Sequence, residues 1–345
     1  MAYNGAVKDF RQIRAGQMPN RVPCVACSEE FDVKWYGKYC YEDVCRDGDK
    51  IYEIWKAAIQ EFDYDWAWVQ VDDCFEFEPL GIVCPGQDNI LRATHGTLPP
   101  GREVLNHLPR LDPETDGRMP EKLKAIRKLR EYFGDTVLIT GSCAAPFSAV
   151  GLMWGIEESM VMLLLEPELL HDAMQYWKNF YMRYIKAQRD AGAHAIWLGD
   201  CNTFSGLLSV PQYEEHILAI TRELVQYAEK ELDVMIWLHN SEISIPHILS
   251  HHSLGTSFES IGPAADIRAV CNAVKGQRAI SGNLDPIEIL WRGTPDAVAL
   301  EVKRIMAIGN PGGGYIFNTG EMNPRQVPVE NMRAFMNTAK SVASY

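Results

Sequence analysis

The sequence predicts an α/β fold, a single (β/α)8 barrel of the TIM type over residues 1–345. Two observations support this prediction: strand-like runs alternate with helix-like stretches, and several of the runs stop at a polar residue. Alternation of strand and helix predicts a parallel sheet joined by right-handed crossovers. A chain of 345 residues is ordinary for one such barrel with insertions, so we expect one domain.

Eight apolar runs rich in β-branched residues give the expected strands, and eight is the number that closes this kind of barrel. They are residues 22–26, 67–71, 136–140, 195–199, 234–238, 255–260, 278–281 and 315–317.

Between these runs lie stretches whose apolar residues recur every three and four positions, the spacing of an amphipathic helix. The expected helices are 50–62, 121–133, 157–191, 211–232, 243–252, 264–274, 286–308 and 329–342.

One segment breaks the alternation. Residues 74–119 follow the second expected strand and contain six prolines and several glycines without a clear period. Long irregular segments in compact domains are commonly lids or binding loops. We therefore expect a lid over the pocket; the alternative is a surface insertion with no role in binding.

Composition excludes several functional classes. The chain has 33 basic and 46 acidic residues, with no basic footprint for nucleic acid. Nine scattered cysteines are too few for a disulfide framework and predict mostly free thiols. The first residues lack the apolar core of a secretory signal, and no apolar run is long enough to span a bilayer. These features predict a soluble, cytoplasmic protein.

Polar side chains follow four of the expected strands. Asp72 and Asp73 follow 67–71, Asp200 follows 195–199, His239 follows 234–238, and Glu259 follows Phe258. Because the carboxyl ends of barrel strands surround one pocket, we expect these side chains to share a site. Each aspartate could instead cap the helix that follows it, and His239 could be a hydrogen-bonded structural residue.

Several segments together resemble the uroporphyrinogen decarboxylase superfamily, which has a (β/α)8 barrel. The segments are TGSCAAPFS (140–148), DCNTFSGLLS (200–209), GNLDP (282–286), GYIFNTGE (314–321) and VPVEN (327–331). They occur in the family's order over nearly the whole chain.

The sequence departs from the decarboxylase branch of that superfamily. Where the decarboxylases carry arginines that hold the porphyrinogen carboxylates, this chain has Glu29 and Glu30. Acids at these positions would repel a polyanion. The histidine expected after the last strand is replaced by Glu321. A decarboxylase remains an alternative interpretation.

The other branch contains corrinoid-dependent methyltransferases, in which zinc is held by a His-x-Cys pair, a later Cys and, in some, a Glu. The matching positions here are His239, Ser241, Glu321 and Glu259, so both thiols are absent. The resemblance therefore implies a zinc site made of His239, Glu259 and Glu321. Imidazole and carboxylate ligands give a harder, more Lewis-acidic site than thiolates do.

A harder metal suits a substrate that leaves through oxygen. The resemblance implies a zinc-dependent methyltransferase that moves a methyl group from an O-methyl substrate, preferentially an aryl methyl ether, to the reduced cobalamin (corrinoid) of a partner protein. It also allows a homodimer. A barrel that has lost its chemistry and only binds a corrinoid or a partner is a third interpretation.

Further roles are assigned within this interpretation. Asp200 and Asp73 are the expected catalytic acids, which would protonate or orient the leaving oxygen. The expected substrate-binding residues include aromatic side chains suited to a flat apolar ligand. They are Asp72, Ser241, Asn202, Asn318, Trp35 and Tyr36.

Overall fold

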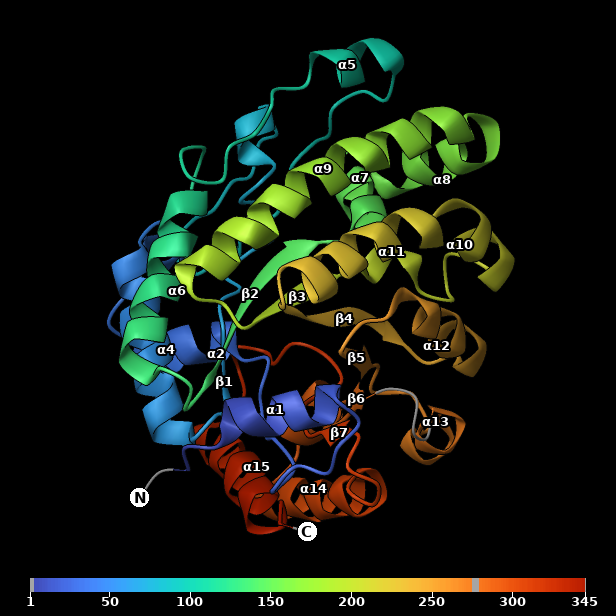
Figure 1. Cartoon of the computed structure of the whole chain (residues 1–345). Coiled ribbons are helices and arrows are strands. Elements are labelled where there is room, and N and C mark those ends of the chain that lie inside the picture. The colour runs from blue at the N-terminus through green and yellow to red at the C-terminus, as the bar shows by residue number, and fades with distance from the viewer. Residues whose placement is uncertain (1–2, 275–278, 345) are drawn as a thin grey trace.

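A computed structural model describes residues 3–274 and 279–344, and its centre is one sheet of seven parallel strands in the order β1 to β7. The strands are β1 Trp66–Trp68, β2 Leu138–Ala144, β3 Ala195–Gly199, β4 Met235–Glu242, β5 Phe258–Ile261, β6 Ala279–Ser281 and β7 Tyr315–Ile316. Neighbours in sequence are neighbours in the sheet, as expected for an α/β fold of the TIM-barrel type (Figure 1). Of the predicted strand 278–281, Arg278 lies outside the described residues.

The first expected strand, 22–26, is the main difference from the predicted barrel. It is an extended segment with single bridges, one of them a parallel bridge between Cys24 and Phe317. On one side the Val25 N–H donates to the Phe317 carbonyl at 2.9 Å, and on the other the Asp65 N–H donates to the Cys24 carbonyl at 3.0 Å. The segment thus occupies the eighth strand position, between β7 and β1, with too few hydrogen bonds to form a strand.

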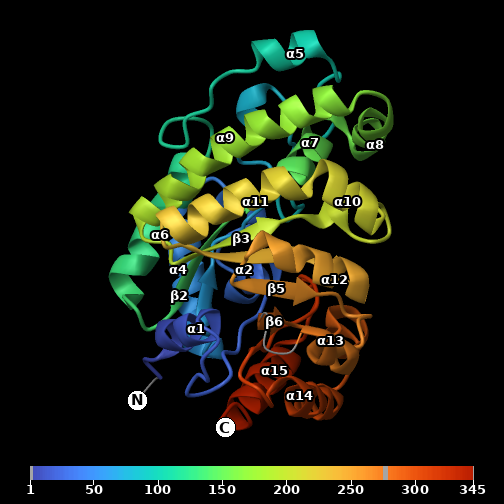
Figure 2. The same cartoon turned by 45° about the vertical axis from the view of Figure 1, so that its right-hand side comes forward.

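Helices cover the outside of the sheet (Figures 1 and 2). The α-helices are α1 Ala6–Arg14, α2 Glu29–Tyr36, α3 Tyr41–Val44, α4 Gly48–Phe62, α5 Arg102–His107, α6 Met119–Phe133, α7 Pro146–Trp154, α8 Ile156–Leu165, α9 Pro167–Ala191, α10 Val210–His216, α11 Leu218–Gln226, α12 Ile245–His251, α13 Ile267–Val274, α14 Pro295–Gly309 and α15 Val329–Ser341. Shorter 3-10 or π-helical turns are η1 Glu78–Leu80, η2 Cys201–Thr203, η3 Tyr227–Glu231, η4 His252–Leu254 and η5 Pro286–Trp291.

Two differences among the helices have local causes. The predicted helix 157–191 is two helices, because Pro167 at the first position of α9 cannot continue α8. Helices α1, α2 and α3, which precede the expected helix α4, were not predicted. Helix α1 does carry an amphipathic pattern, and its buried Phe10 packs against Trp237 and Phe258 at ring-centroid distances of 6.0 and 5.7 Å.

Tryptophans fill the inside of the sheet. Trp66 lies 4.9 Å from Trp237, and Trp68 lies 5.1 Å from Trp197, measured between ring centroids. Side chains two residues apart on a strand share one face, so Trp66 and Trp68 both point inward. The interior is therefore a packed aromatic column, and the carboxyl ends of the strands lie at one end of it.

The segment 74–119 contains only η1 and α5 as regular structure. Most of it lies beside α9 and α7 (Figure 1), where the Leu98 N–H donates to the Met153 carbonyl and the Tyr176 hydroxyl donates to the Pro109 carbonyl. These contacts fix part of the segment against α7 and α9, and its role as a lid stays a prediction.

All nine cysteines are free, as predicted. Within the described residues no single helix is both long and apolar enough to cross a membrane; α7 and α8 meet that test only as a pair bent by 114°.

Candidate functional site

A cavity of about 180 Å³ lies at the carboxyl ends of β1 to β4. Its floor is aromatic and its walls are polar. The lining residues are Trp68, Gln70, Asp72, Asp73, Glu76, Lys122, Ser142, Cys143, Ala144, Ser148, Leu152, Trp197, Gly199, Cys201, Asn202, His239, Glu321 and Met322. Five of the predicted site residues meet here: Asp72, Asp73, Asn202, His239 and Glu321.

His239 is held on three sides. Its Nδ1 lies 2.6 Å from the Ser260 hydroxyl, and its Nε2 lies 3.3 Å from Glu321 Oε1. Its ring stacks on Trp197 with centroids 4.6 Å apart. Strand β4 pairs His239 with Ser260 of β5, so that hydroxyl is placed by the sheet register. The result is an imidazole of fixed orientation whose Nε2 faces the pocket.

The charge of His239 depends on its neighbours. Burial alone would lower the pKa of His239, but contact with Cys201 and with Glu321 raises it to about 10. The pKa of Glu321 is in turn lowered, against the effect of burial, by its hydrogen bond to His239. At neutral pH the pair is therefore an imidazolium beside a carboxylate.

The two neighbouring aspartates after β1 differ. Asp72 is buried and accepts two hydrogen bonds from Arg118, at 2.8 and 2.9 Å, so its charge is neutralised by a bidentate ion pair. Asp73 keeps access to solvent through the cavity and accepts a hydrogen bond from Gln70 Nε2 at 2.5 Å. Surrounding protein atoms, and the nearby charge of Asp72, raise the pKa of Asp73. Asp73 is thus the more available of the two for proton transfer.

The pocket also contains charged residues that sequence reasoning missed. Lys122 of α6 is only 2% exposed, and Glu76 is 4% exposed. Burial raises the pKa of Glu76 to about 6 and lowers that of Lys122. The available signal was their context: Lys122 stands on the apolar face of an amphipathic helix, and Glu76 stands between two buried phenylalanines. A charge in an apolar environment is costly and marks a candidate site.

Glu259 does not share the pocket with His239. Adjacent strand residues point to opposite faces, and Ser260 is the one that points to His239. Glu259 is completely buried on the other face, where its Oε1 lies 2.8 Å from Nδ1 of His251 in α12.

Asp200 lies behind the pocket wall. Its Oδ1 accepts a hydrogen bond from Ser148, a lining residue, at 3.1 Å, and burial raises its pKa to about 6. Asn202 does line the pocket, and its backbone N–H donates to the same Ser148 hydroxyl.

The remaining predicted substrate-binding residues lie outside the cavity. Ser241 sits at positive φ in the β4 irregularity, and Asn318 is buried with its amide 3.2 Å from Cys27 Sγ. Trp35 packs on Phe62, and Tyr36 hydrogen-bonds to Glu53. The aromatic residues of the pocket are instead Trp68 and Trp197, which the strands themselves supply.

The zinc site implied by the resemblance is only partly present. His239 and Glu321 converge, but Glu259 points away. Within the part of the chain that the structure describes, no three His, Cys, Asp or Glu side chains are placed to hold a metal ion. Zinc would need a further ligand, and Cys201 is the nearest candidate because it lines the pocket and contacts His239.

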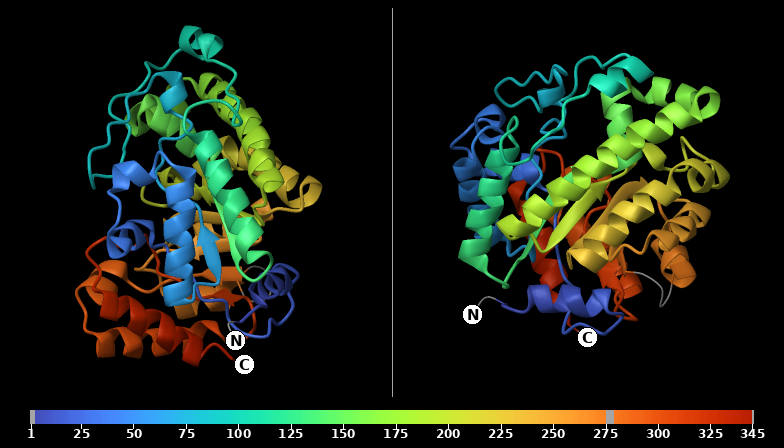
Figure 3. Two further views of the ribbon diagram at one scale, coloured as in Figure 1. Left: turned by 90° about the vertical axis from the view of Figure 1, so that its left-hand side faces the viewer. Right: turned by 45° about the horizontal axis from the view of Figure 1, so that its top comes forward.

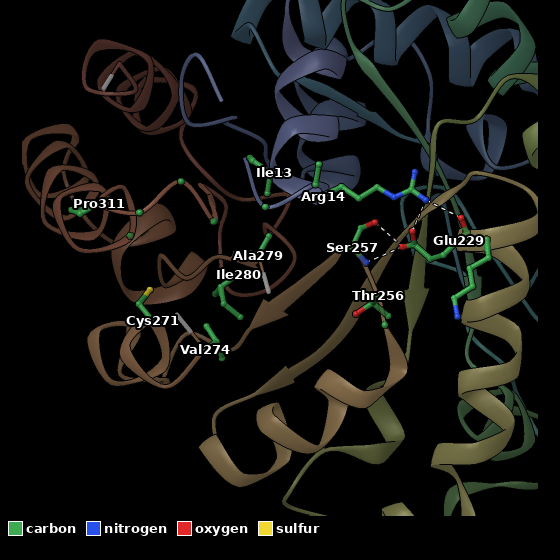
Figure 4. Close-up of a pocket in the computed structure, with 18 residues that line it drawn as sticks. Ile13, Arg14, Glu229, Thr256, Ser257, Cys271, Val274, Ala279, Ile280 and Pro311 are labelled. Carbon is green, nitrogen blue, oxygen red and sulfur yellow. Dashed lines mark hydrogen bonds and ion pairs between the residues drawn. The ribbon is translucent and has the colours of Figure 1, made fainter. Parts of the chain in front are cut away.

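A larger cavity of about 520 Å³ lies elsewhere, between α1, the end of α13 and the glycine-rich turn 312–314 (Figure 4). Two of its charged residues, Arg14 and Glu229, are paired with each other, and Glu229 also accepts hydrogen bonds from Ser257. Val274 and Ala279 line this cavity and stand on either side of residues 275–278, which are not among the described residues. None of the predicted site residues lines it, so we assign the chemistry to the smaller cavity.

Comparisons with known proteins agree with this architecture. Residues 8–342 match the profile of the family described as uroporphyrinogen decarboxylase (URO-D). A methylcobamide:CoM methyltransferase of Methanosarcina acetivorans is 30% identical over 212 residues, covering 60% of this chain and 62% of that protein. A uroporphyrinogen decarboxylase of Trichlorobacter lovleyi is 30% identical over 242 residues, covering 64% of this chain and 65% of that protein. The match thus spans less than two thirds of either relative.

A solved structure described as a methyltransferase from Methanosarcina mazei superposes with a TM-score of 0.87, covering 97% of this chain and 98% of that chain. At 17% identity this likeness supports the fold alone. Because a methyltransferase and a decarboxylase match at the same identity, the choice between reactions depends on the pocket.

Proposed function

The chain belongs to the uroporphyrinogen decarboxylase family, and we propose that it is a corrinoid-dependent methyltransferase of that family. In this proposal it takes a methyl group from an O-methyl substrate, an aryl methyl ether, and transfers it to the reduced corrinoid of a partner protein. The observation that carries the proposal is His239, paired with Glu321 at the wall of a small cavity that is also lined by two tryptophans.

The size and lining of the cavity disfavour the decarboxylase alternative. A porphyrinogen carries several carboxylates, which require cationic partners. No arginine is among the described residues that line the cavity, and the cations it does contain, Lys122 and His239, are accompanied by four carboxylates. A volume of about 180 Å³ is close to the roughly 150 Å³ of an engineered cavity that holds benzene, which fits a single aromatic ring.

Charge also bears on the direction of methyl transfer. A thiol acceptor with a sulfonate group, such as the coenzyme M in the name of one relative, would bring an anion. Asp73, Glu76 and Glu321 line the cavity and outnumber its two cations, with Asp72 already neutralised by Arg118. A neutral methyl ether avoids that repulsion. Transfer from a methylcobamide to a thiol is the second candidate, favoured by that relative.

His239 and Glu321 give the pocket a proton donor. The corrinoid would supply the nucleophile that attacks the methyl carbon. As the carbon–oxygen bond breaks, negative charge develops on the oxygen, and the imidazolium can donate the Nε2 proton to it. The Nε2 proton moves from its contact with Glu321 to the substrate oxygen, while the Ser260 hydroxyl at Nδ1 and the stack on Trp197 keep the ring oriented. Trp68 and Trp197 hold the ring of the substrate.

The decisive experiment combines the purified chain with chemically reduced cobalamin and a panel of methyl donors, and follows the cobalt absorption spectrum. We expect methylcobalamin to form from a methoxylated aromatic compound and uroporphyrinogen to be left unchanged. Decarboxylation of uroporphyrinogen, or methylation of a thiol from methylcobalamin with no reaction of any methyl ether, would refute the proposal.

A further inference from the structure

Lys122 and its partners form a second polar group in the pocket, on a wall different from that of His239. Lys122 Nζ donates to the Ser142 carbonyl at 2.8 Å and to the Ser142 hydroxyl at 2.5 Å. The Ser142 hydroxyl also bonds to Gln70. An ammonium has three donors, so these two bonds leave one for a ligand in the cavity that Lys122 lines.

Glu76 supplies the matching acceptor. It lines the same cavity, and the Tyr181 hydroxyl donates to its Oε1 at 3.3 Å. A carboxylate has about four acceptor positions, so acceptor capacity remains. The positive charge of Lys122 favours the ionised form of Glu76, although the described residues include no ion pair within 4.0 Å between the two side chains. A ligand group between them would bond to both.

The signs of these charges restrict the ligand group. A carboxylate or sulfonate on the ligand would face Glu76 and Asp73, and an amine would face Lys122. A hydroxyl can accept from Lys122 and donate to Glu76 at the same time, without bringing a charge of its own. A methoxyl group in the same place could accept from Lys122 but could not donate to Glu76, so the remaining acceptor positions of that carboxylate would lose access to water without gaining a hydrogen bond from the ligand.

We propose that Lys122 and Glu76 form a subsite for a free hydroxyl group of the methyl donor, so that the donor is a methoxyphenol rather than a fully methylated ring or a methoxylated aromatic acid. This inference rests on the proposed function, because it names the substrate class of the same pocket. Ser142 and Gln70 hold the ammonium in place, and Tyr181 holds the carboxylate.

The test is a binding measurement without any corrinoid, so that it stands apart from the methyl-transfer assay. Isothermal titration compares 2-methoxyphenol with 1,2-dimethoxybenzene, 4-methoxybenzoate and 2-mercaptoethanesulfonate. We expect 2-methoxyphenol to bind at least about tenfold more tightly than the others, the usual size of a hydrogen bond to a charged group.

Two variants locate the effect. Lys122→Met should reduce the preference for 2-methoxyphenol over 1,2-dimethoxybenzene to less than about threefold. Glu76→Gln keeps nearly the same side-chain shape but removes the negative charge of the carboxylate. The variant should therefore discriminate less strongly against 4-methoxybenzoate, relative to 2-methoxyphenol, than the parent chain does. If Lys122→Met fails to fold, Glu76→Gln alone tests the subsite. Lys124→Met is the matched control, because Lys124 lies on the same helix but pairs with Asp49 and Glu121 outside the pocket.

Several outcomes overturn the subsite. Equal binding of 2-methoxyphenol and 1,2-dimethoxybenzene by the parent chain would do so, as would tighter binding of either anion or an unchanged preference in both variants. Absence of binding by all four compounds also overturns it. If 2-methoxyphenol binds with the expected preference but methylcobalamin never forms from it, the subsite stands and the proposed methyl transfer fails.

Discussion

His239 and Glu321 face each other across the candidate site, with Nε2 of the imidazole 3.3 Å from Oε1 of the carboxylate. One residue belongs to β4 and the other follows β7, so the barrel-like sheet brings them together. The carboxylate and the nearby Cys201 keep the imidazole protonated far above its ordinary pKa. The charge of the pocket therefore depends on two residues, His239 and Glu321, which can be replaced separately.

We expect Glu321→Gln and Cys201→Ser each to lower the pKa of His239 from about 10, with the larger effect from Cys201, whose influence on His239 is the stronger. The protonated ring is the active form, so activity should be retained below this pKa and lost as pH rises through it. In each variant that loss should begin at lower pH. A pH–rate profile and NMR titration of the His239 ring measure both effects; unchanged profiles in both variants would contradict this assignment.

His239→Ala should reduce methyl transfer by at least about a hundredfold, the lower range for loss of a general acid. His194 offers a matched control because it is also buried but bonds to Ile139 and Asp135 outside the pocket. His194→Ala should lower the melting temperature and leave the rate per folded molecule unchanged. Equal rate losses in the two variants would show that His239 acts only through stability.

Zinc binding should depend on His239 and Glu321 and not on Glu259. We expect equilibrium dialysis to show at least about a tenfold loss of zinc affinity in Glu321→Gln, the size of effect that altered ligand shells commonly produce. Glu259→Gln should bind zinc as the parent does, because Glu259 is paired with His251 on the other face of β5. A larger loss in Glu259→Gln, or no zinc bound by the parent, contradicts this ligand set.

Arg118→Met should destabilise the chain by about 3–5 kcal/mol, because it leaves the buried Asp72 without its bidentate partner. Replacing both residues, Arg118→Met with Asp72→Asn, should recover a large part of that loss. Denaturant unfolding of both variants measures the difference. If the double variant is no more stable than Arg118→Met alone, the ion pair is not the source of the effect.

Asp32 should make stability decrease with rising pH. It is buried, bonds to Ser28 and Tyr64, and burial raises its pKa to about 8. Between the ordinary aspartate pKa of about 3.9 and 8, the folded chain holds a proton that the unfolded chain has lost. Stability contributed by Asp32 is therefore complete below that window and falls by about 1.4 kcal/mol per pH unit within it. Asp32→Asn should flatten this slope in unfolding curves measured at pH 5, 6.5 and 8.

The sequence predicted the parallel α/β architecture well because apolar runs and amphipathic spacing depend on local pattern. It placed strand bounds less well: β2 extends to Ala144, past the apolar run that predicted it, since buried Ser142 and Cys143 still pair with β3. The family resemblance was confirmed by the match over residues 8–342.

The site was predicted in part, for a geometric reason. A position at a strand end does not say which face a side chain takes, and one step along β5 separates Ser260, which touches His239, from Glu259, which does not. Lys122 was missed because it comes from the outer layer of helices, which a search of strand ends does not examine. Its reach into the pocket follows from the packing of α6 on β2.

The bridge between Cys24 and Phe317 has a consequence for the order of biosynthesis. The segment 22–26 leaves the ribosome early, yet its partners include Phe317 and Ala343, and the ends α1 and α15 lie on the same side of the molecule (Figure 3). At about 5–20 residues per second, close to 300 further residues take roughly 15–60 s to synthesise. For that interval the edge of the segment that will meet Phe317 has no partner, so the speed of translation and the presence of chaperones, rather than the final stability, set its risk of aggregation.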